Sequence, residues 1–258
     1  MLMVNQLAGF GGGYSQRLVI CDSADFDGSN DYMLRGAALT GVVDGKKGIL
    51  SFWIRLDGGD DSLQFVFGAK AAVGNPVAVA RDSSNVFGVS GNNSASVSIL
   101  NIRTASTYVS SGTWRHILAS WDLGTAGARH LYVNDVSDLS VTTFTNDTID
   151  YAQASPDWSV GATAAAASKL NGCIAELYFN TVDYFDLSVT SNRRKFISDT
   201  LKPVYLGATG ELPTNAAPAV YLHLDDGEAV ANFATNRGTG GDFTITGTLD
   251  TGSTSPSD

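Results

Sequence analysis

The sequence is poor in the residues that most catalytic and nucleic-acid-binding sites use. Among its 258 residues only three are glutamate and three are histidine, and the longest basic run is Arg193-Arg194-Lys195. A formal net charge of −10 argues against a nucleic-acid partner, because its phosphates would be repelled. No stretch approaches the roughly 20 consecutive apolar residues of a membrane-spanning helix. We therefore expect neither nucleic-acid binding nor membrane insertion.

The N-terminal segment MLMVNQLAGFGGGYS lacks the basic stretch and the continuous apolar core of a secretory signal. We therefore expect a protein that is made in a cytoplasm and is not exported through such a signal. Cysteine is scarce too, and Cys21 and Cys173 each sit inside an apolar run. Cysteine is among the residue types that are most often buried, so we predict two buried thiols that stay reduced in that compartment.

Glycine and alternating apolar residues, in contrast, are abundant. The sequence contains 28 glycines and 43% hydrophobic residues, a composition typical of strands and turns and poor in helix formers. The clearest pattern runs from Thr113 to Asn134, where apolar and polar residues alternate, a loop with two glycines follows, and the alternation resumes. This pattern predicts two antiparallel strands joined by a turn. Gly48 to Leu56 shows the same alternation.

The alternation also predicts which side chains form the core. We expect nine apolar residues to lie between two packed sheets: Leu50, Phe52, Ile54, Ile117, Ala119, Leu131, Val133, Leu177 and Phe179. Within residues 170–180, strict alternation turns Cys173 and Ala175 toward this core. It turns Ile174 and Glu176 the other way.

Four segments of the chain resemble the laminin G-like, or concanavalin A-like, jelly-roll domains. The resemblance rests on FDGSNDY at residues 26–32, SFWI at 51–54, TWRHILASWDLGTAGARHLYVN at 113–134 and LNGCIAELYFN at 170–180. These segments come in the order of the family and cover about residues 24 to 200. The resemblance implies an all-β sandwich of two antiparallel sheets with one short helix near residues 188–198.

The chain divides into three parts. Residues 1–17 form a glycine-rich N-terminal arm, residues 18–200 the jelly roll, and residues 201–258 a C-terminal extension that we expect to pack on the sandwich. The extension resembles the tail of laminin G-like structural proteins encoded by tailed bacteriophages.

The resemblance to phage proteins implies a non-enzymatic structural protein of a tailed-phage virion. Such a protein would be displayed on the particle surface, as a head decoration or in the neck or tail, where it would stabilise the particle or contact host surface glycans. Its partners would be other virion proteins, further copies of the same chain and a host glycan. For assembly we point to four apolar residues of the arm: Leu2, Val4, Leu7 and Phe10.

Two alternatives stay open, a free lectin-like adhesion module that binds carbohydrate and a polysaccharide hydrolase. Glycosidases of this fold carry an acid and a nucleophile on one strand, in an E-x-D-x-E pattern, because retaining cleavage needs two carboxylates about 5–5.5 Å apart. The matching strand here offers Glu176 alone, while Glu211 and Glu228 fall outside the domain match. None of the three histidines lies near a nucleophile motif such as G-x-S-x-G, so we expect no enzymatic activity.

Two groups of residues could bind a ligand. Calcium, the one cofactor that the resemblance suggests, takes oxygen ligands at the sheet rim of such domains, and the candidates are Asp27, Asn30, Asp31 and Glu176. The alternative is that these residues cap turns. A glycan or a neighbouring subunit would contact outward-facing strand positions, namely Trp53, Arg55, Trp114, Tyr132 and Tyr178. Large aromatic side chains can equally pack under a loop or a subunit, and the sequence leaves both open.

Overall fold

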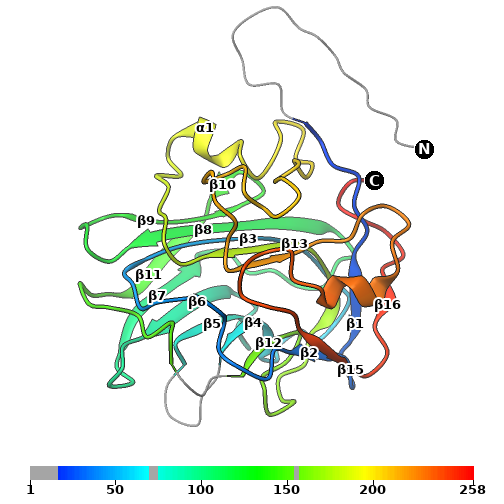
Figure 1. Ribbon diagram of the computed structural model, residues 1–258, viewed down its shortest axis with the longest axis horizontal. Helices are drawn as coiled ribbons and strands as arrows, with labels where there is room; N and C mark the ends of the chain where they lie inside the picture. The colour runs from blue at the N-terminus through cyan, green and yellow to red at the C-terminus, as the bar shows by residue number, and fades with distance from the viewer. Residues whose placement is uncertain (1–16, 70–74, 154–156) are drawn as a thin grey trace, which may run out of the picture.

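Two stacked β-sheets make up the computed structural model, which describes residues 17–69, 75–153 and 157–258. Within those residues each sheet has eight strands, and neighbouring strands pair antiparallel. Figure 1 shows the sheets as two layers, one above the other. The predicted all-β sandwich of two antiparallel sheets is confirmed. The four arm residues proposed for assembly, Leu2, Val4, Leu7 and Phe10, lie outside the described residues.

The first sheet carries the predicted hairpin and the strand from residues 170–180. In spatial order it consists of β10 (Val136–Ser137), β9 (Arg129–Val133), β8 (Trp114–Asp122), β3 (Lys47–Leu56), β13 (Asn171–Asn180), β1 (Ala24–Asp27) and β16 (Asp250–Thr251). A further strand, β14 (Val220–Leu222), pairs with β13.

The second sheet is built mainly from shorter strands that fall, in the sequence, between the strands of the first sheet. In spatial order it consists of β11 (Leu139–Phe144), β7 (Ser98–Thr104), β6 (Phe87–Asn92), β5 (Val77–Arg81), β4 (Gln64–Ala69), β12 (Trp158–Val160), β2 (Tyr32–Leu34) and β15 (Thr244–Thr246).

The main core fills the space between the two sheets. All nine residues predicted for it belong to one cluster of buried side chains, in which Phe52 and Phe179 are 0% exposed. Phe52 of β3 packs edge to face on Phe87 of β6, with ring centroids 6.4 Å apart, so the two sheets contact each other directly. The prediction of these core residues is confirmed.

Strand β13 departs from strict alternation at Glu176. Its pairing with β3 shifts register between Ala175 and Tyr178, and Glu176 adopts a left-handed φ of 53°, which together mark a β-bulge. Before the bulge, Ile174 faces the main core, whereas Ala175 packs with Trp53 on the opposite face. The predicted inward orientation of Cys173 and Ala175 is therefore wrong, because one extra residue exchanges the two faces of the strand.

The C-terminal extension contributes strands to both sheets. Its strand β14 pairs with β13, β15 pairs with β2, and β16 pairs with β1. A short 3-10 helix, η1 (Val230–Ala234), buries Phe233 in the main core. Residues 201–258 are thus part of the sandwich itself.

Residues 185–206 cover the outer face of the first sheet. They include the predicted short helix, α1 (Thr190–Arg193), and Figure 1 shows this yellow to gold segment above β8, β3 and β13. Leu187 and Phe196 of this segment pack in a second buried cluster with Tyr132 and Tyr178 of the sheet. Both faces of the first sheet are therefore buried, one by the second sheet and one by the chain's own later residues.

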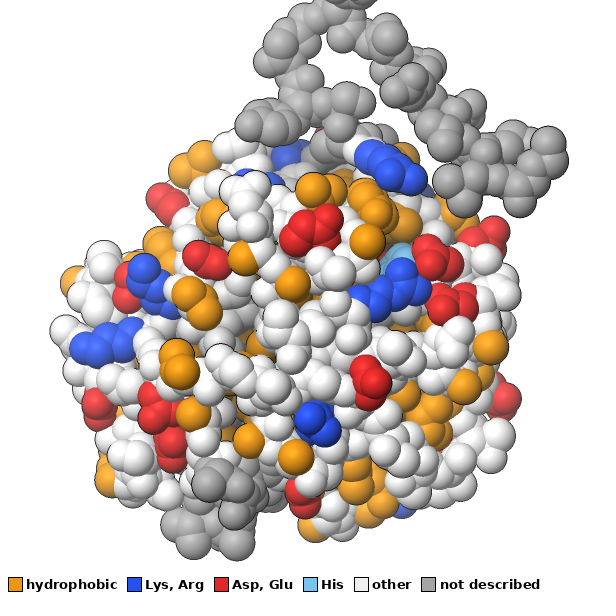
Figure 2. Space-filling view, in the orientation of Figure 1, with side chains coloured by type: hydrophobic (Ala, Val, Ile, Leu, Met, Phe, Trp, Pro, Cys, Tyr) orange, Lys and Arg blue, Asp and Glu red, His pale blue; other side chains and the backbone are white. Residues whose placement is uncertain are grey.

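The surface carries charges of both signs. On the face shown in Figure 2, basic and acidic side chains lie interspersed among polar and apolar ones. Of the helices in the described residues, none has the length and apolar content needed to cross a bilayer.

Candidate functional site

The aromatic residues predicted to contact a glycan lie beneath other parts of the chain. Trp53 is 3% exposed and stacks against His116, with ring centroids 4.8 Å apart. Tyr178 is 0% exposed and packs on Phe196. The Arg193 guanidinium lies over the Tyr132 ring, 4.9 Å from its centroid. In this structure, packing under a covering segment, the alternative that the sequence left open, accounts for these aromatic side chains.

Arg55 and Trp114 anchor the C-terminal residues. The Arg55 guanidinium donates to both carboxylate oxygens of Asp57, at 3.0 Å and 2.8 Å, and to the Thr254 hydroxyl at 2.7 Å. The Trp114 indole N–H donates to the same hydroxyl at 3.1 Å. Arg55 is only 8% exposed and Trp114 is half-buried, and both hold residues near the C-terminus in place.

Of the predicted calcium ligands, Asp27 and Asp31 lie next to each other in the turn after β1, whereas Glu176 lies apart from them. Asp27 Oδ1 accepts the backbone N–H groups of Ser29 and Asn30, at 2.7 Å and 3.1 Å. Asp31 Oδ1 accepts the backbone N–H of Thr248 at 2.7 Å. Burial acts to raise the pKa of Asp27, but the backbone hydrogen bonds outweigh it and lower that pKa. Asp27 therefore caps its own turn, as the alternative has it, whereas Asp31 ties that turn to the extension.

Glu176 is separated from these residues along β13. Asp27 pairs with Asn171 at one end of β13, whereas Glu176 lies in the bulge beyond the last residue that β1 pairs, Ile174. Its carboxylate is 3% exposed and accepts the Tyr221 hydroxyl at 2.9 Å. The structure thus assigns Glu176 to a buried contact with the extension, away from the loop that holds Asn30.

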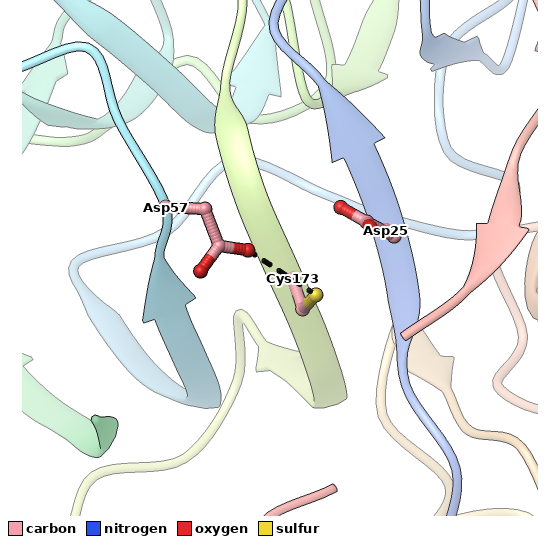
Figure 3. Close-up of side chains that lie close together, drawn as sticks. All are labelled: Asp25, Asp57 and Cys173. Carbon is pink, nitrogen blue, oxygen red and sulfur yellow. Dashed lines mark hydrogen bonds between the residues drawn. The ribbon is translucent and has the colours of Figure 1, made fainter. Parts of the chain in front are cut away.

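One group of potential ligand atoms was not predicted from the sequence. Asp25, Asp57 and Cys173 bring two carboxylate oxygens and a thiol within 4.8 Å of one another (Figure 3). The register explains the meeting, because Asp25 pairs with Cys173 and Cys173 pairs with Arg55 across three neighbouring strands. The sequence does not give the register of these three strands, so it could not predict that Asp25, Asp57 and Cys173 meet.

The chemistry of this group is limited by its neighbours. Burial raises the pKa of Cys173, so the residue stays a thiol and is a weak nucleophile. Burial also raises the pKa of Asp25. Asp57 is held on both oxygens by Arg55. Although the two carboxylates approach the separation of about 5–5.5 Å used by retaining glycosidases, Asp57 is not a free nucleophile.

A hollow of about 320 Å³ opens to solvent at one end of the first sheet. We call it the rim hollow. It lies where β3 begins and where β8 and β13 end, and it is lined by Val43, Asp44, Gly45, Lys46, Lys47, Asp122, Thr181 and Val182. Strand ends that meet at one rim place side chains together although they are far apart in sequence.

The rim hollow offers hydrogen-bonding groups of several kinds. Asp122 Oδ1 accepts the backbone N–H of Gly124 at 2.9 Å, which fixes the carboxylate beside the hairpin turn. Lys47 pairs with Asp122 across the strands and has no ion-pair partner among the described residues. Val43 and Val182 are 66% and 67% exposed. A small concave surface with a few convergent polar groups beside apolar ones is typical of ligand sites.

The fold defines a jelly-roll sandwich of two antiparallel sheets, and sequence comparison gives its family. Residues 27–183 match the family described as the concanavalin A-like lectin/glucanases superfamily. Because the match spans more than half of the 258 residues, the chain belongs to this family. No curated protein sequence matches the chain.

Several solved structures are similar to the chain at low sequence identity. A protein from Bacteroides ovatus, described as carbohydrate binding, is 14% identical with a TM-score of 0.59, and the match covers 91% of this chain and 60% of that one. A heptameric pentraxin from Limulus polyphemus is 12% identical with a TM-score of 0.46, covering 65% and 78% of the two chains. Domain 4 of an extracellular arabinanase from Geobacillus stearothermophilus, in complex with arabinotriose, is 18% identical with a TM-score of 0.43, covering 76% of each chain. At 14% identity the likeness to the Bacteroides ovatus protein shows the fold and nothing further.

Proposed function

We propose that the chain is a non-catalytic carbohydrate-binding domain and that the rim hollow is its glycan site. The observation that carries the proposal is the juxtaposition of exposed Lys47 and half-buried Asp122 with two exposed valines around one hollow. Sugar rings present hydroxyl groups at their edges and C–H groups on their faces. A surface that combines a charged donor, charged acceptors and aliphatic side chains can engage both.

The carboxylates support a binding role over a catalytic one. All three glutamates accept hydrogen bonds from their neighbours: Glu176 from Tyr221, Glu211 from Thr209 and Glu228 from Arg237. Glu176 is 3% exposed, so a substrate bound at the surface would not reach it. Asp57, the better exposed member of the Asp25–Asp57 pair, is neutralised by Arg55.

Binding is tested with a glycan array followed by titration of the best ligand. We expect Lys47→Ala combined with Asp122→Asn to weaken binding at least about tenfold, which corresponds to one or two lost hydrogen bonds. Lys169→Ala is the control for the lysine substitution, because it removes the same positive charge from a loop outside the rim hollow. Equal binding by both variants at unchanged melting temperature would place the glycan site elsewhere.

The finer proposal is that this domain is displayed on the virion surface of a tailed phage, as a head decoration or in the neck or tail. There it would stabilise the particle, contact host glycans and have other virion proteins and its own copies as partners. The support is the resemblance of residues 201–258 to phage structural proteins, together with the part those residues take in both sheets. Mass spectrometry of purified particles tests it, and particles without the chain would refute it while leaving the glycan site standing.

A further inference from the structure

A chain of ionisable groups runs from the bulge in β13 to the surface of the extension. At its buried end, the Glu176 carboxylate contacts the Nδ1 of His223 and accepts the Tyr221 hydroxyl at 2.9 Å. His223 is 2% exposed and Tyr221 is 0% exposed. Glu176 and His223 therefore meet where water cannot separate them.

The outer end of this chain of groups reaches solvent. The Nε2 of His223 lies 3.0 Å from Asp225 Oδ1, and the Asp225 side chain is 65% exposed. The Arg237 guanidinium binds Asp225 at 3.0 Å and Glu228 at 2.8 Å. Charges of opposite sign thus alternate from the protein interior to the surface.

The two contacts of His223 determine which protonation state fits. A neutral imidazole has one N–H donor and one acceptor nitrogen, whereas the protonated ring has two donors. Here both ring nitrogens face carboxylate oxygens, and an ionised carboxylate can only accept hydrogen bonds. Loss of the proton from either nitrogen would turn a lone pair toward a carboxylate, so the doubly protonated ring is the state that satisfies both contacts while Glu176 and Asp225 are ionised.

Other groups around His223 come from each packed segment. The backbone of Cys21 forms an isolated β-bridge with that of Asp225. Burial is the main cause that raises the pKa of the Cys21 thiol, and the nearby Glu176 carboxylate raises it further. Burial acts to lower the pKa of His223, as Arg237 does, but Glu176 and Asp225 outweigh them and raise it above its ordinary value of 6.5. Tyr221 stacks on the ring at 5.6 Å between centroids.

The contacts around His223 join three separate parts of the chain. Glu176 belongs to β13 of the jelly roll, His223 follows β14 of the extension, and Cys21 belongs to the segment before β1. Asp22 N–H donates to the Leu224 carbonyl oxygen at 3.1 Å. Glu176 also holds a left-handed φ of 53°, a conformation that a non-glycine residue keeps only when surrounding contacts impose it.

We propose that Glu176, His223 and Asp225 form a proton-dependent latch that holds the extension strand β14 on the jelly roll while His223 is doubly protonated and loosens it when the ring loses a proton. Glu176, His223 and Asp225 do not line the rim hollow. The stability of the β14–β13 pairing should therefore depend on pH. The contacts between the two sheets are apolar and should not.

Hydrogen exchange of the full chain tests the latch. Protection factors, corrected for the intrinsic pH dependence of exchange, are measured for residues 219–225 and for β8 from about pH 6 to about pH 9. We expect protection of residues 219–225 to fall at least about tenfold over this range, with that of β8 unchanged. In parallel, ¹⁵N spectra of the imidazoles should show both ring nitrogens of His223 protonated at the lower pH.

Two variants and a control decide the outcome. His223→Gln keeps a hydrogen-bonding group but carries no titratable charge, so protection of residues 219–225 should become independent of pH. If that variant does not fold, Asp225→Asn, at an exposed side chain, should move the transition to lower pH. His130→Gln, at the half-buried histidine that contacts Tyr184 far from the extension, should behave as wild type. An unchanged pH response in the first two variants, or a single protonated nitrogen on His223 at about pH 6, overturns the latch.

Discussion

The outer face of the first sheet and the rim hollow are built from opposite kinds of side chain. The face carries Trp53, Tyr132 and Tyr178, which residues 185–206 and their neighbours cover, whereas the rim hollow carries charged and aliphatic side chains and stays open. Aromatic residues at outward strand positions thus mark a surface that has to be buried, and the structure shows that the chain buries it with its own later segments. In this protein the covered face stabilises the fold, and the open rim is available for a ligand.

The comparison is tested most strongly by truncating neighbouring residues on the two faces of β3. Phe52 lies in the main core and Trp53 in the cluster on the opposite face. Because both are at most 3% exposed, we expect Phe52→Ala and Trp53→Ala each to lower the free energy of unfolding by about 3–5 kcal/mol. Denaturant unfolding measures this. A loss below about 1 kcal/mol for Trp53→Ala would show that its face is open in solution.

A second, smaller effect separates the two regions by pH. Because folding raises the pKa of His223 above 6.5, protonation of His223 stabilises the fold fully below that value. This stabilisation is lost as pH rises through the pKa in the folded state, at about 1.4 kcal/mol for each unit of difference. No histidine lines the rim hollow, so glycan affinity should stay constant where stability falls. Thermal melts and titrations at matched pH values measure both, and His223→Gln should flatten the melts alone.

The other two histidines sharpen this expectation. Burial lowers the pKa of His116 to about 3, and its Nε2 lies 2.8 Å from the Ser51 hydroxyl, so it stays neutral throughout the range. Burial also lowers the pKa of His130. A stability decline toward alkaline pH that survives in His223→Gln would therefore need a source other than histidine.

The smallest change concerns the thiols on the covered face. Cys21 and Cys173 are free and buried, at 1% and 0% exposure, which confirms the predicted burial. Burial raises the pKa of both thiols, so neither should react with an alkylating reagent in the folded protein. Intact mass after alkylation under denaturing, non-reducing conditions should show two modified thiols. A mass without modification would reveal a disulfide.

The sequence predicted the fold and its main core because period-two alternation in long strands such as β3 and β8 specifies the inner face. The prediction was wrong where one residue breaks the period. Cys173 and Ala175 exchange faces because Glu176 adopts a left-handed conformation. A glutamate in the sequence does not predict that conformation. The sequence also could not place residues 185–206 over Trp53 and Tyr178, since that contact is set by tertiary packing.

The rim hollow escaped prediction for a related reason. Its members come from the start of β3 and the ends of β8 and β13, and of these only Asp122 belongs to a segment that resembles the family. Lys47 and Asp122 become neighbours only through the register of two strands. Knowing the hairpin and β3 is not enough, because their relative register has to be known as well.

Chemical-shift mapping with the best array ligand tests the central claim most directly. Backbone and side-chain signals of the full chain are followed during titration, including the indole N–H signals of Trp53 and Trp114. We predict that the largest changes fall on residues 43–47, 122, 181 and 182, and that the indole signals of the covered face stay in place. Shifts concentrated on Trp53 and Trp114 with an unperturbed rim would contradict the account, because the glycan would then bind the face that residues 185–206 cover.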